Sequence, residues 1–298
     1  MNRVFLILLI TIFYCLNLSA QSSSEVLIQL FENNQNVVNY TYSYEFYGEG
    51  ENTIGKTELT NNLSFQKVSQ IGDTTTISIQ ADSTKISNES ALKDGEVGLL
   101  FAMVGLNMNV QIWGKGDSMN VLNREEVAKE VEEGIIGLSP DARKSIIMNM
   151  LEEDEELFFL KLYELNYAPL LKHAGQAVKI PNYEERDSII DASPEQPRTS
   201  IKMVKESEAL TGSYRIKNST LSKSDPFTQE NDNYTIESNG INSSVEEVLE
   251  VNKVGQIKHL EISTIQEHNG FKVKVNGNVV QEMKPMKEFL KIKIIRVE

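Results

Sequence analysis

The chain has 298 residues, of which 40% are hydrophobic and 24% are charged, and its formal net charge is −14. This acidic balance argues against nucleic acid and anionic membrane surfaces as partners, because both repel a negatively charged protein. The single cysteine, Cys15, excludes a disulfide framework, and it leaves no thiolate metal site.

The first twenty residues have the layout of a secretory signal peptide. Arg3 gives a basic start, an apolar run follows over 4–14, and the small residues Ser19 and Ala20 end the segment. We expect cleavage after Ala20. An uncleaved anchor is the alternative, although the apolar stretch is shorter than the roughly 20 residues that span a bilayer.

Cys15 raises the question of a lipoprotein. The bulky Phe13 and Tyr14 precede it where small residues are needed, so we expect no lipidation at Cys15. Residues 21–298 would then be exported and, after signal removal, not integral to a membrane. A long exported chain without disulfides fits a bacterial periplasm or cell surface better than a eukaryotic secreted domain.

The N-terminal part of the mature chain predicts strands with two helices. A short helix is expected at 23–32, and the strict alternation over 39–46 predicts a half-buried strand. The segments around 63–71 and 74–82 predict an antiparallel hairpin joined by a turn at Gly72 and Asp73. The apolar period changes at 97–104, which predicts a buried helix.

The middle of the chain combines a hairpin with acidic helices. Residues 108–123 predict strand, turn and strand, and Asn123 with Glu126 marks the start of a helix. Ser139 and Pro140 begin a second helix to about residue 151, and a third is expected at 154–165. Four prolines then lie within 169–198, which predicts a connector.

From Thr199 onward the pattern is all β, and Asn276-Gly277 predicts a type I′ hairpin turn. The expected fold class is α+β, mostly β, with antiparallel curved sheets or meanders and a helical segment at about 92–165 between two β-rich halves. The expected regions are a signal peptide (1–20), an N-terminal α+β region (21–168), the connector (169–198) and a C-terminal antiparallel β region (199–298). Whether the two halves share one sheet stays open.

The stretch GENTIGKT, residues 50–57, matches the phosphate-binding pattern G-x-x-x-x-G-K-[ST]. That pattern needs a buried strand before it and a helix after it, and here an alternating strand precedes it and no helical period follows. We therefore predict a hairpin loop and no nucleotide cofactor. Ser64 and Lys67 have the spacing of a penicillin-binding pair, but in a strand they point to opposite faces.

Metal and catalytic patterns are also absent. His173, His259 and His268 lack metal-ligand spacing, and the acidic run 152–156 lacks the glycine of a calcium loop, so no metal is expected. No catalytic residue is assigned. Carboxylates that meet only in space stay open as a route to hydrolysis.

Two sets of residues stand out as candidate sites. The first is a set of aromatic and methionine side chains that could line a cavity for an apolar ligand or form the core instead: Tyr40, Tyr42, Tyr44, Phe46, Met103 and Met108. The second is a repeated Asp-Ser/Thr triplet, which resembles the O-glycosylation site of exported Bacteroidota proteins but also arises in turn-rich chains. Its candidate acceptors are Thr74, Ser83, Ser118 and Ser188.

The export signal, the absence of mature cysteines and the two β-rich halves resemble the layout of uncharacterised secreted proteins of Bacteroidota. The resemblance carries no catalytic motif. It implies an exported envelope or extracellular protein with a non-enzymatic binding or scaffold role, whose partner is a protein or an apolar small molecule. The alternatives are a periplasmic carrier of a lipid or other apolar ligand, and a hydrolase without a recognisable motif.

Overall fold

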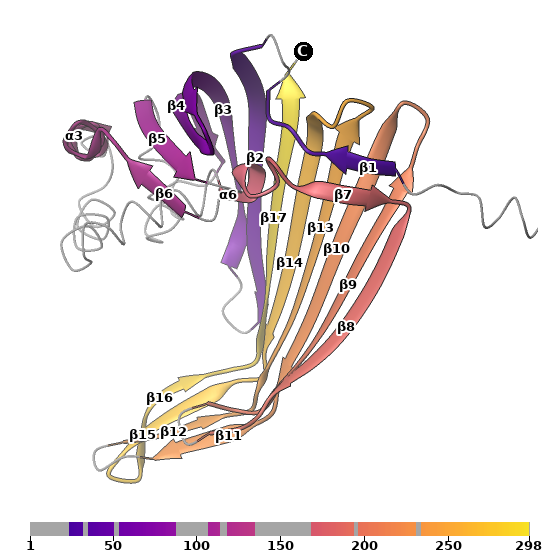
Figure 1. Cartoon of the computed structure of the whole chain (residues 1–298). Coiled ribbons are helices and arrows are strands. Elements are labelled where there is room, and N and C mark those ends of the chain that lie inside the picture. Colours follow the sequence, from indigo (N-terminus) through magenta and orange to yellow (C-terminus); the bar gives the residue numbers. More distant parts are fainter. Residues whose placement is uncertain are drawn as a thin grey trace, which may run out of the picture.

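A large antiparallel sheet dominates the molecule (Figure 1). The computed structural model describes residues 24–31, 35–50, 54–87, 107–113, 118–134, 168–193, 196–230 and 234–297. Eleven strands form the large sheet in the order β6-β5-β4-β3-β2-β17-β14-β13-β10-β9-β8. The expectation of a mostly β fold with antiparallel sheets is confirmed.

The strands of the large sheet come from both ends of the chain. From the N-terminal side they are β2 (Val37–Gly50), β3 (Ile54–Ile71), β4 (Thr74–Ile86), β5 (Asn107–Trp113) and β6 (Ser118–Val121). From the C-terminal side they are β8 (Asn182–Ile190), β9 (Thr199–Ala209), β10 (Ser213–Ser224), β13 (Ile241–Asn252), β14 (Ile257–His268) and β17 (Met286–Val297). β17 pairs with β2 over twelve residue pairs, so the two β-rich halves share one continuous sheet.

A four-stranded sheet continues the large one around a corner. It contains β11 (Phe227–Glu230), β12 (Tyr234–Ser238), β15 (Phe271–Val275) and β16 (Asn278–Met283), in the order β11-β12-β15-β16. These strands extend β10, β13, β14 and β17 respectively, and their order repeats that of the strands they extend. The small sheet turns away from the large one at its lower end (Figure 1).

Proline and glycine side by side produce this corner. Pro226, Gly240, Gly270 and Pro285 lie at the four joints between the sheets. Proline supplies no N–H to a ladder. Gly240 has a φ of +92°, and a Cβ at this position would come within 2.5 Å of the Ser224 carbonyl oxygen. The backbones at this joint are therefore too close for any residue larger than glycine. The ladders of the large sheet and of the small sheet both end along the line of these four joints.

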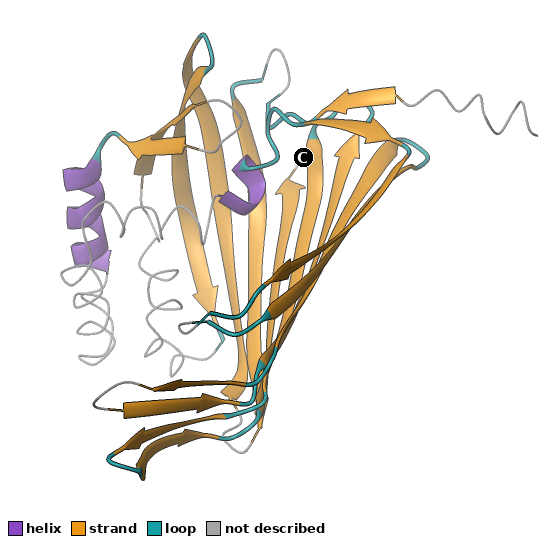
Figure 2. Cartoon of the chain, turned by 60° about the horizontal axis from the view of Figure 1, so that its bottom comes forward, coloured by secondary structure: helices purple, strands orange, loops and turns teal. Residues whose placement is uncertain are grey.

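A lid lies across the upper end of one face of the large sheet (Figures 1 and 2). It consists of β1 (Ser24–Leu27), its antiparallel partner β7 (Ala177–Ile180), and the short helix α6 (Ala168–Leu171). The backbone N–H of Gln29 donates to the Gly255 carbonyl at 2.8 Å, and the Ser207 hydroxyl donates to the Lys179 carbonyl at 2.7 Å. We call the covered face the inner face and the opposite one the outer face.

Several local predictions can now be compared with the structure. The helix expected at 23–32 is wrong, because residues 24–27 form β1. The segment expected as a connector, 169–198, contains most of α6 together with β7 and β8. The helices expected at 97–104, 139–151 and 154–165 lie outside the described residues. The turn at Asn276-Gly277 is confirmed, since both residues have positive φ, 52° and 79°.

The helix expected after residue 122 is α3 (Arg124–Gly134), and Asn123 stands at its N-cap position, where its carbonyl accepts a hydrogen bond from the Val127 N–H at 3.0 Å. The side-chain oxygen of Asn123 accepts a hydrogen bond from the Asn109 backbone N–H at 2.8 Å, and its amide nitrogen donates to the Asn107 carbonyl at 2.7 Å. The Asn123 side chain thus ties the start of the helix to β5. Of the two helices in the described residues, neither is long and apolar enough to span a bilayer.

Candidate ligand-binding face

The two faces of the large sheet differ in how their charged side chains are arranged. Directly paired residues of an antiparallel ladder point to the same face, so the register assigns each side chain to one side. On the outer face neighbouring strands are joined by ion pairs, such as Lys217–Glu246 at 2.7 Å, Lys291–Glu261 at 2.8 Å and Lys287–Glu267 at 2.8 Å. These pairs are typical of a surface in water.

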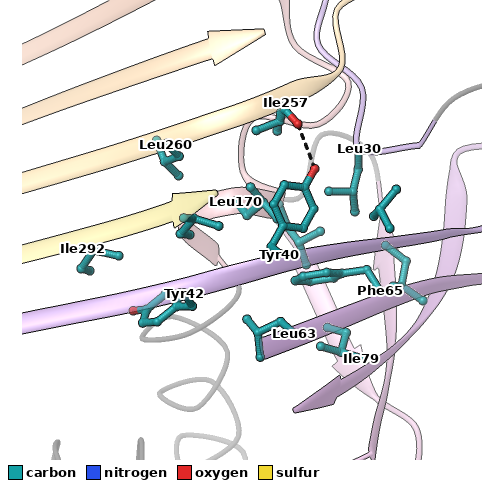
Figure 3. Packing of buried hydrophobic residues seen from close by; sticks show 14 of the residues in the cluster. Leu30, Tyr40, Tyr42, Leu63, Phe65, Ile79, Leu170, Ile257, Leu260 and Ile292 are labelled. Carbon is teal, nitrogen blue, oxygen red and sulfur yellow. Dashed lines mark hydrogen bonds between the residues drawn. The ribbon is translucent and has the colours of Figure 1, made fainter. Parts of the chain in front are cut away.

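The upper half of the inner face forms the main core of the protein. Tyr40 and Tyr42 are 0% and 1% exposed, and they pack with Leu63, Phe65 and residues of the lid (Figure 3). The Tyr40 hydroxyl donates to the carbonyl of Ile257 at 3.2 Å, and burial raises its pKa. This bond joins β2 to β14 across the core.

The candidate ligand-lining residues of the sequence therefore fall into different places. Tyr40, Tyr42, Tyr44 and Met108 are buried members of the core cluster, while Phe46 is partly buried at its margin. Met103 lies outside the described residues. Among the five described residues of this set, Phe46 lies on the inner face and is partly exposed.

Below the core the inner face becomes half-exposed without becoming charged. One register row crosses seven strands, and between β10 and β2 it carries uncharged side chains only. Its members, from β8 to β2, are Arg186, Met203, Thr220, Val245, Thr264, Leu290 and Phe46. Met203 is 41% exposed, and the residues from Thr220 to Phe46 are partly buried. We call this set the inner row.

The row of the inner face next to the lid contains a buried charge cluster. Glu247 is 6% exposed, and its carboxylate contacts Lys172, which is half-exposed, and accepts a hydrogen bond from Asn218 at 2.7 Å. His173 Nε2 lies 3.3 Å from the same carboxylate, in electrostatic contact but without hydrogen-bond geometry. Burial alone would raise the pKa of Glu247, but interaction with His173 and with Lys172 outweighs it and lowers the pKa to about 2. The cluster fastens the turn after α6 to β13 and β10.

A groove of about 370 Å³ opens on the inner face where β8, β9 and β10 meet the free edge of the sheet. Its floor includes Met203 and Thr220 of the inner row, and charged side chains surround it: Glu184, Arg186 and Lys205. The hydrogen bond from Asn182 lowers the pKa of Glu184, burial opposes this, and the charges of Arg186, Lys205 and Lys179 lower it further. Three cations thus act on one carboxylate here.

A larger groove, of about 530 Å³, lies over the lower part of the outer face. Its apolar floor is formed by Leu221, Ile265 and Ile189. Two of its lysines are neutralised, because Lys287 pairs with Glu267 at 2.8 Å and Lys202 pairs with Glu185 at 2.6 Å. The third lysine of this groove, Lys223, forms no ion pair with another described residue, so a cation without an ion-pair partner lines each of the two grooves.

The stretch GENTIGKT lies where β2 turns into β3, and these strands are antiparallel neighbours, so the predicted hairpin is confirmed. Lys56 is paired with Glu45 at 3.2 Å and with Glu58 at 2.6 Å on the outer face. Thr57, in contrast, is buried on the inner face opposite Phe46. The lysine and threonine of the pattern thus point to opposite sides of the sheet.

The other sequence motifs are scattered over the fold. Thr74 begins β4 after the turn, and Ser188 lies on the exposed edge strand β8, while Ser83 and Ser118 lie in β4 and β6. The three histidines do not converge: His259 lies on the outer face, and His268 lies 3.3 Å from Glu288 near the corner. Among the described residues, no group of three acidic, histidine or cysteine side chains could hold a metal ion.

Sequence reasoning missed the residues of the inner row other than Phe46. Thr220, Val245 and Thr264 belong to no motif, and they share a surface only through the register of the strands. The available signal was alternation in β17, where Lys287, Lys291 and Lys293 alternate with apolar or acidic residues. That pattern distinguishes a charged face from a largely apolar one.

Comparison with known proteins gives no family for this chain. No protein-family model matches the sequence, and no curated protein matches it. The solved structure "Lipid-protein interactions in lipovitellin" has a TM-score of 0.36 and 10% identity over 88% of this chain. This chain covers 25% of that one, a quarter of its length.

Two further solved structures are less similar. A mutant of Rh. blastica porin has a TM-score of 0.18 and 8% identity, with 88% of this chain and 99% of that chain covered. Pseudomonas aeruginosa OccK2 (OpdF) has a TM-score of 0.21 and 5% identity, with 92% and 99% covered. All these scores are too low to indicate a shared fold.

Proposed function

We propose that this is an exported, non-enzymatic binding protein that holds an apolar or amphiphilic ligand, such as a lipid, on the lower half of the inner face. The observation that carries the proposal is the contrast between the two faces. The outer face also has a row without charged members between β10 and β2, but ion pairs flank it on both sides; the members of that row are Leu221, Ser244, Ile265, Phe289 and Tyr47. The inner row between β10 and β2 has no charged member and is only partly buried.

The physical basis is the removal of apolar surface from water. Each square ångström of apolar surface that a ligand and this face bury together contributes about 25 cal/mol. Threonine and valine present methyl groups on a sheet, so an acyl chain lying across them meets apolar atoms along its length. Of the two acids that adjoin the inner row, Glu247 is paired with Lys172, and Glu288 lies 3.3 Å from Nε2 of His268.

The location proposed for the ligand differs from a cavity behind the tyrosines. Tyr42 and Tyr44 are packed in the core, which counts against a ligand at that place. The row below them offers surface that the described residues leave partly exposed. Export is proposed on the signal peptide, and binding is proposed on the chemistry of the inner face.

Binding is tested by titrating protein purified from exporting cells with N-phenylnaphthylamine, a neutral fluorophore that brightens in apolar surroundings. Thr264→Arg places a cation on the inner row and should weaken binding about tenfold or more, because burial of an unpaired charge is costly. Ser263→Arg, one residue earlier on β14, points to the outer face and should leave the affinity unchanged. The absence of saturable binding, or an equal loss in both variants, would overturn the proposal.

A further inference from the structure

The inner row is asymmetric along its length. At the β8 end it begins with Arg186, which is exposed, and at the β2 end it finishes with Phe46, which packs against the core. Between Thr220 on β10 and Phe46 on β2 lie four strand spacings of about 4.8 Å each, or about 19 Å of uncharged surface. A long chain with a polar group at one end matches this layout.

The sign of the polar group follows from the charges at the β8 end. Arg186 and Lys205 are neighbours on the inner face of β8 and β9, and Lys179 of the lid lies close enough to act on the same carboxylate, Glu184. Arg186 Nη2 lies 3.6 Å from Glu184, while Lys205 and Lys179 form no direct ion pair with another described residue. Lys179 faces Glu25 across the β1–β7 ladder, so Arg186 and Lys205 against Glu184 leave a local excess of one positive charge in a chain whose net charge is −14.

We infer that the ligand is an anionic amphiphile, bound with its head group at Arg186 and Lys205 and its chain along the inner row towards Phe46. The inference rests on the proposed function and adds a head-group class and an orientation. A carboxylate or a phosphate would suit the site, because the guanidinium of Arg186 can donate two parallel hydrogen bonds to either. The groove of about 370 Å³ at this end gives the head group room beside Met203 and Thr220.

The outer-face groove offers a comparison for this assignment. It is larger and also contains lysines, but Lys202 and Lys287 are held by Glu185 and Glu267 within 2.8 Å. An anion that binds at Lys202 or Lys287 would have to break these pairs, whereas Lys223, the third lysine of that groove, forms no ion pair with another described residue. At the β8 edge of the inner face, an anion can contact Lys205 without breaking an ion pair.

The experiment compares three ligands with the same twelve-carbon chain, namely dodecanoate, dodecyl phosphate and dodecanol, each displacing N-phenylnaphthylamine from the protein at low salt. The double variant Arg186→Ala/Lys205→Ala should weaken the preferred anion about tenfold, since each partly exposed ion pair contributes about threefold. Dodecanol should bind the variant as it binds the wild type. The matched control, Lys202→Ala/Lys223→Ala, removes the same charge from the outer face of β9 and β10 and should change nothing.

The outcomes separate the two proposals. Tighter binding of dodecanoate or of dodecyl phosphate than of dodecanol, lost in the Arg186/Lys205 variant, supports the inference, and the tighter anion identifies the head group. Equal binding of all three ligands, unaffected by the variant, overturns the head-group inference and leaves apolar binding intact. An equal loss of anion binding in the control variant overturns it as well, because the effect would then be one of net charge. No displacement by any of the three contradicts the proposed function itself.

Discussion

Glutamine at position 247 should destabilise the protein, and the loss should depend on pH. The pKa of Glu247 is lowered from 4.5 to about 2 by interaction with His173 and Lys172, which outweighs the opposing effect of burial. A depressed carboxyl pKa contributes stability that is present above the unfolded value and disappears as the pH falls through the folded value. Here the shift corresponds to about 3 kcal/mol of unfolding free energy at neutral pH.

The Glu247→Gln variant lacks this contribution at every pH. Urea denaturation should therefore show a gap of about 3 kcal/mol between wild type and variant at neutral pH, which shrinks as the pH falls from 4.5 towards 2. Glu246→Gln is the control, because Glu246 lies one residue away on the outer face in a half-exposed pair with Lys217. It should cost less than about 1 kcal/mol. A gap as small as that of the control, or one that stays constant with pH, would refute the role given to the cluster.

Three further predictions concern stability and are measured by urea denaturation at neutral pH. Thr57→Val should stabilise the protein by about 1 kcal/mol, because the Thr57 hydroxyl is fully buried without a hydrogen-bond partner in the described part of the chain; a loss of stability would indicate a partner. Tyr40→Phe should cost about 1 kcal/mol by leaving the Ile257 carbonyl without its donor, and a neutral result would mean that this bond contributes nothing to stability. Gly255→Ala should cost clearly more than Gly212→Ala: both glycines have a φ near +90°, but only at Gly255 would a Cβ meet a neighbour, the Leu27 carbonyl oxygen at 2.0 Å. Equal costs would show that contact with β1 is unimportant.

Local sequence signals predicted the strands well because each depends on a few adjacent residues. The alternation over 39–46 predicts β2, and in the structure Tyr40, Tyr42 and Tyr44 are indeed buried between exposed or half-buried neighbours. Asn276-Gly277 predicts a turn for a reason that is equally local, since both residues accept positive φ. Both signals are read without any knowledge of the rest of the chain.

The pairings that make one sheet could not be read in the same way. β2 and β17 are separated by more than two hundred residues, and the sequence of neither strand identifies the strand with which it pairs. β8 was missed because its residues are almost all exposed, so that no apolar alternation marks them, and because prolines surround it. β1 was mistaken for a helix, since a run of four residues is too short for its period to be decisive.

For the same reason, only part of the candidate site could be predicted from the sequence. The aromatic stripe was correctly seen as a set of residues on one face, but most of its members turned out to fill the core. Thr220, Val245 and Thr264 are ordinary strand residues until the register sets them in one row with Leu290 and Phe46. A surface made by five strands exists only after the strands are paired.

The central claim is that an amphiphile lies on the lower inner face, and photo-crosslinking tests it most directly. A fatty acid with a diazirine near its chain terminus would be bound to the protein, irradiated and mapped by peptide mass spectrometry. The account predicts adducts on inner-row positions of β13, β14 and β17, namely Val245, Thr264 and Leu290. Adducts on outer-face residues such as Leu221 and Ile265, or none that unlabelled fatty acid can compete away, would contradict it.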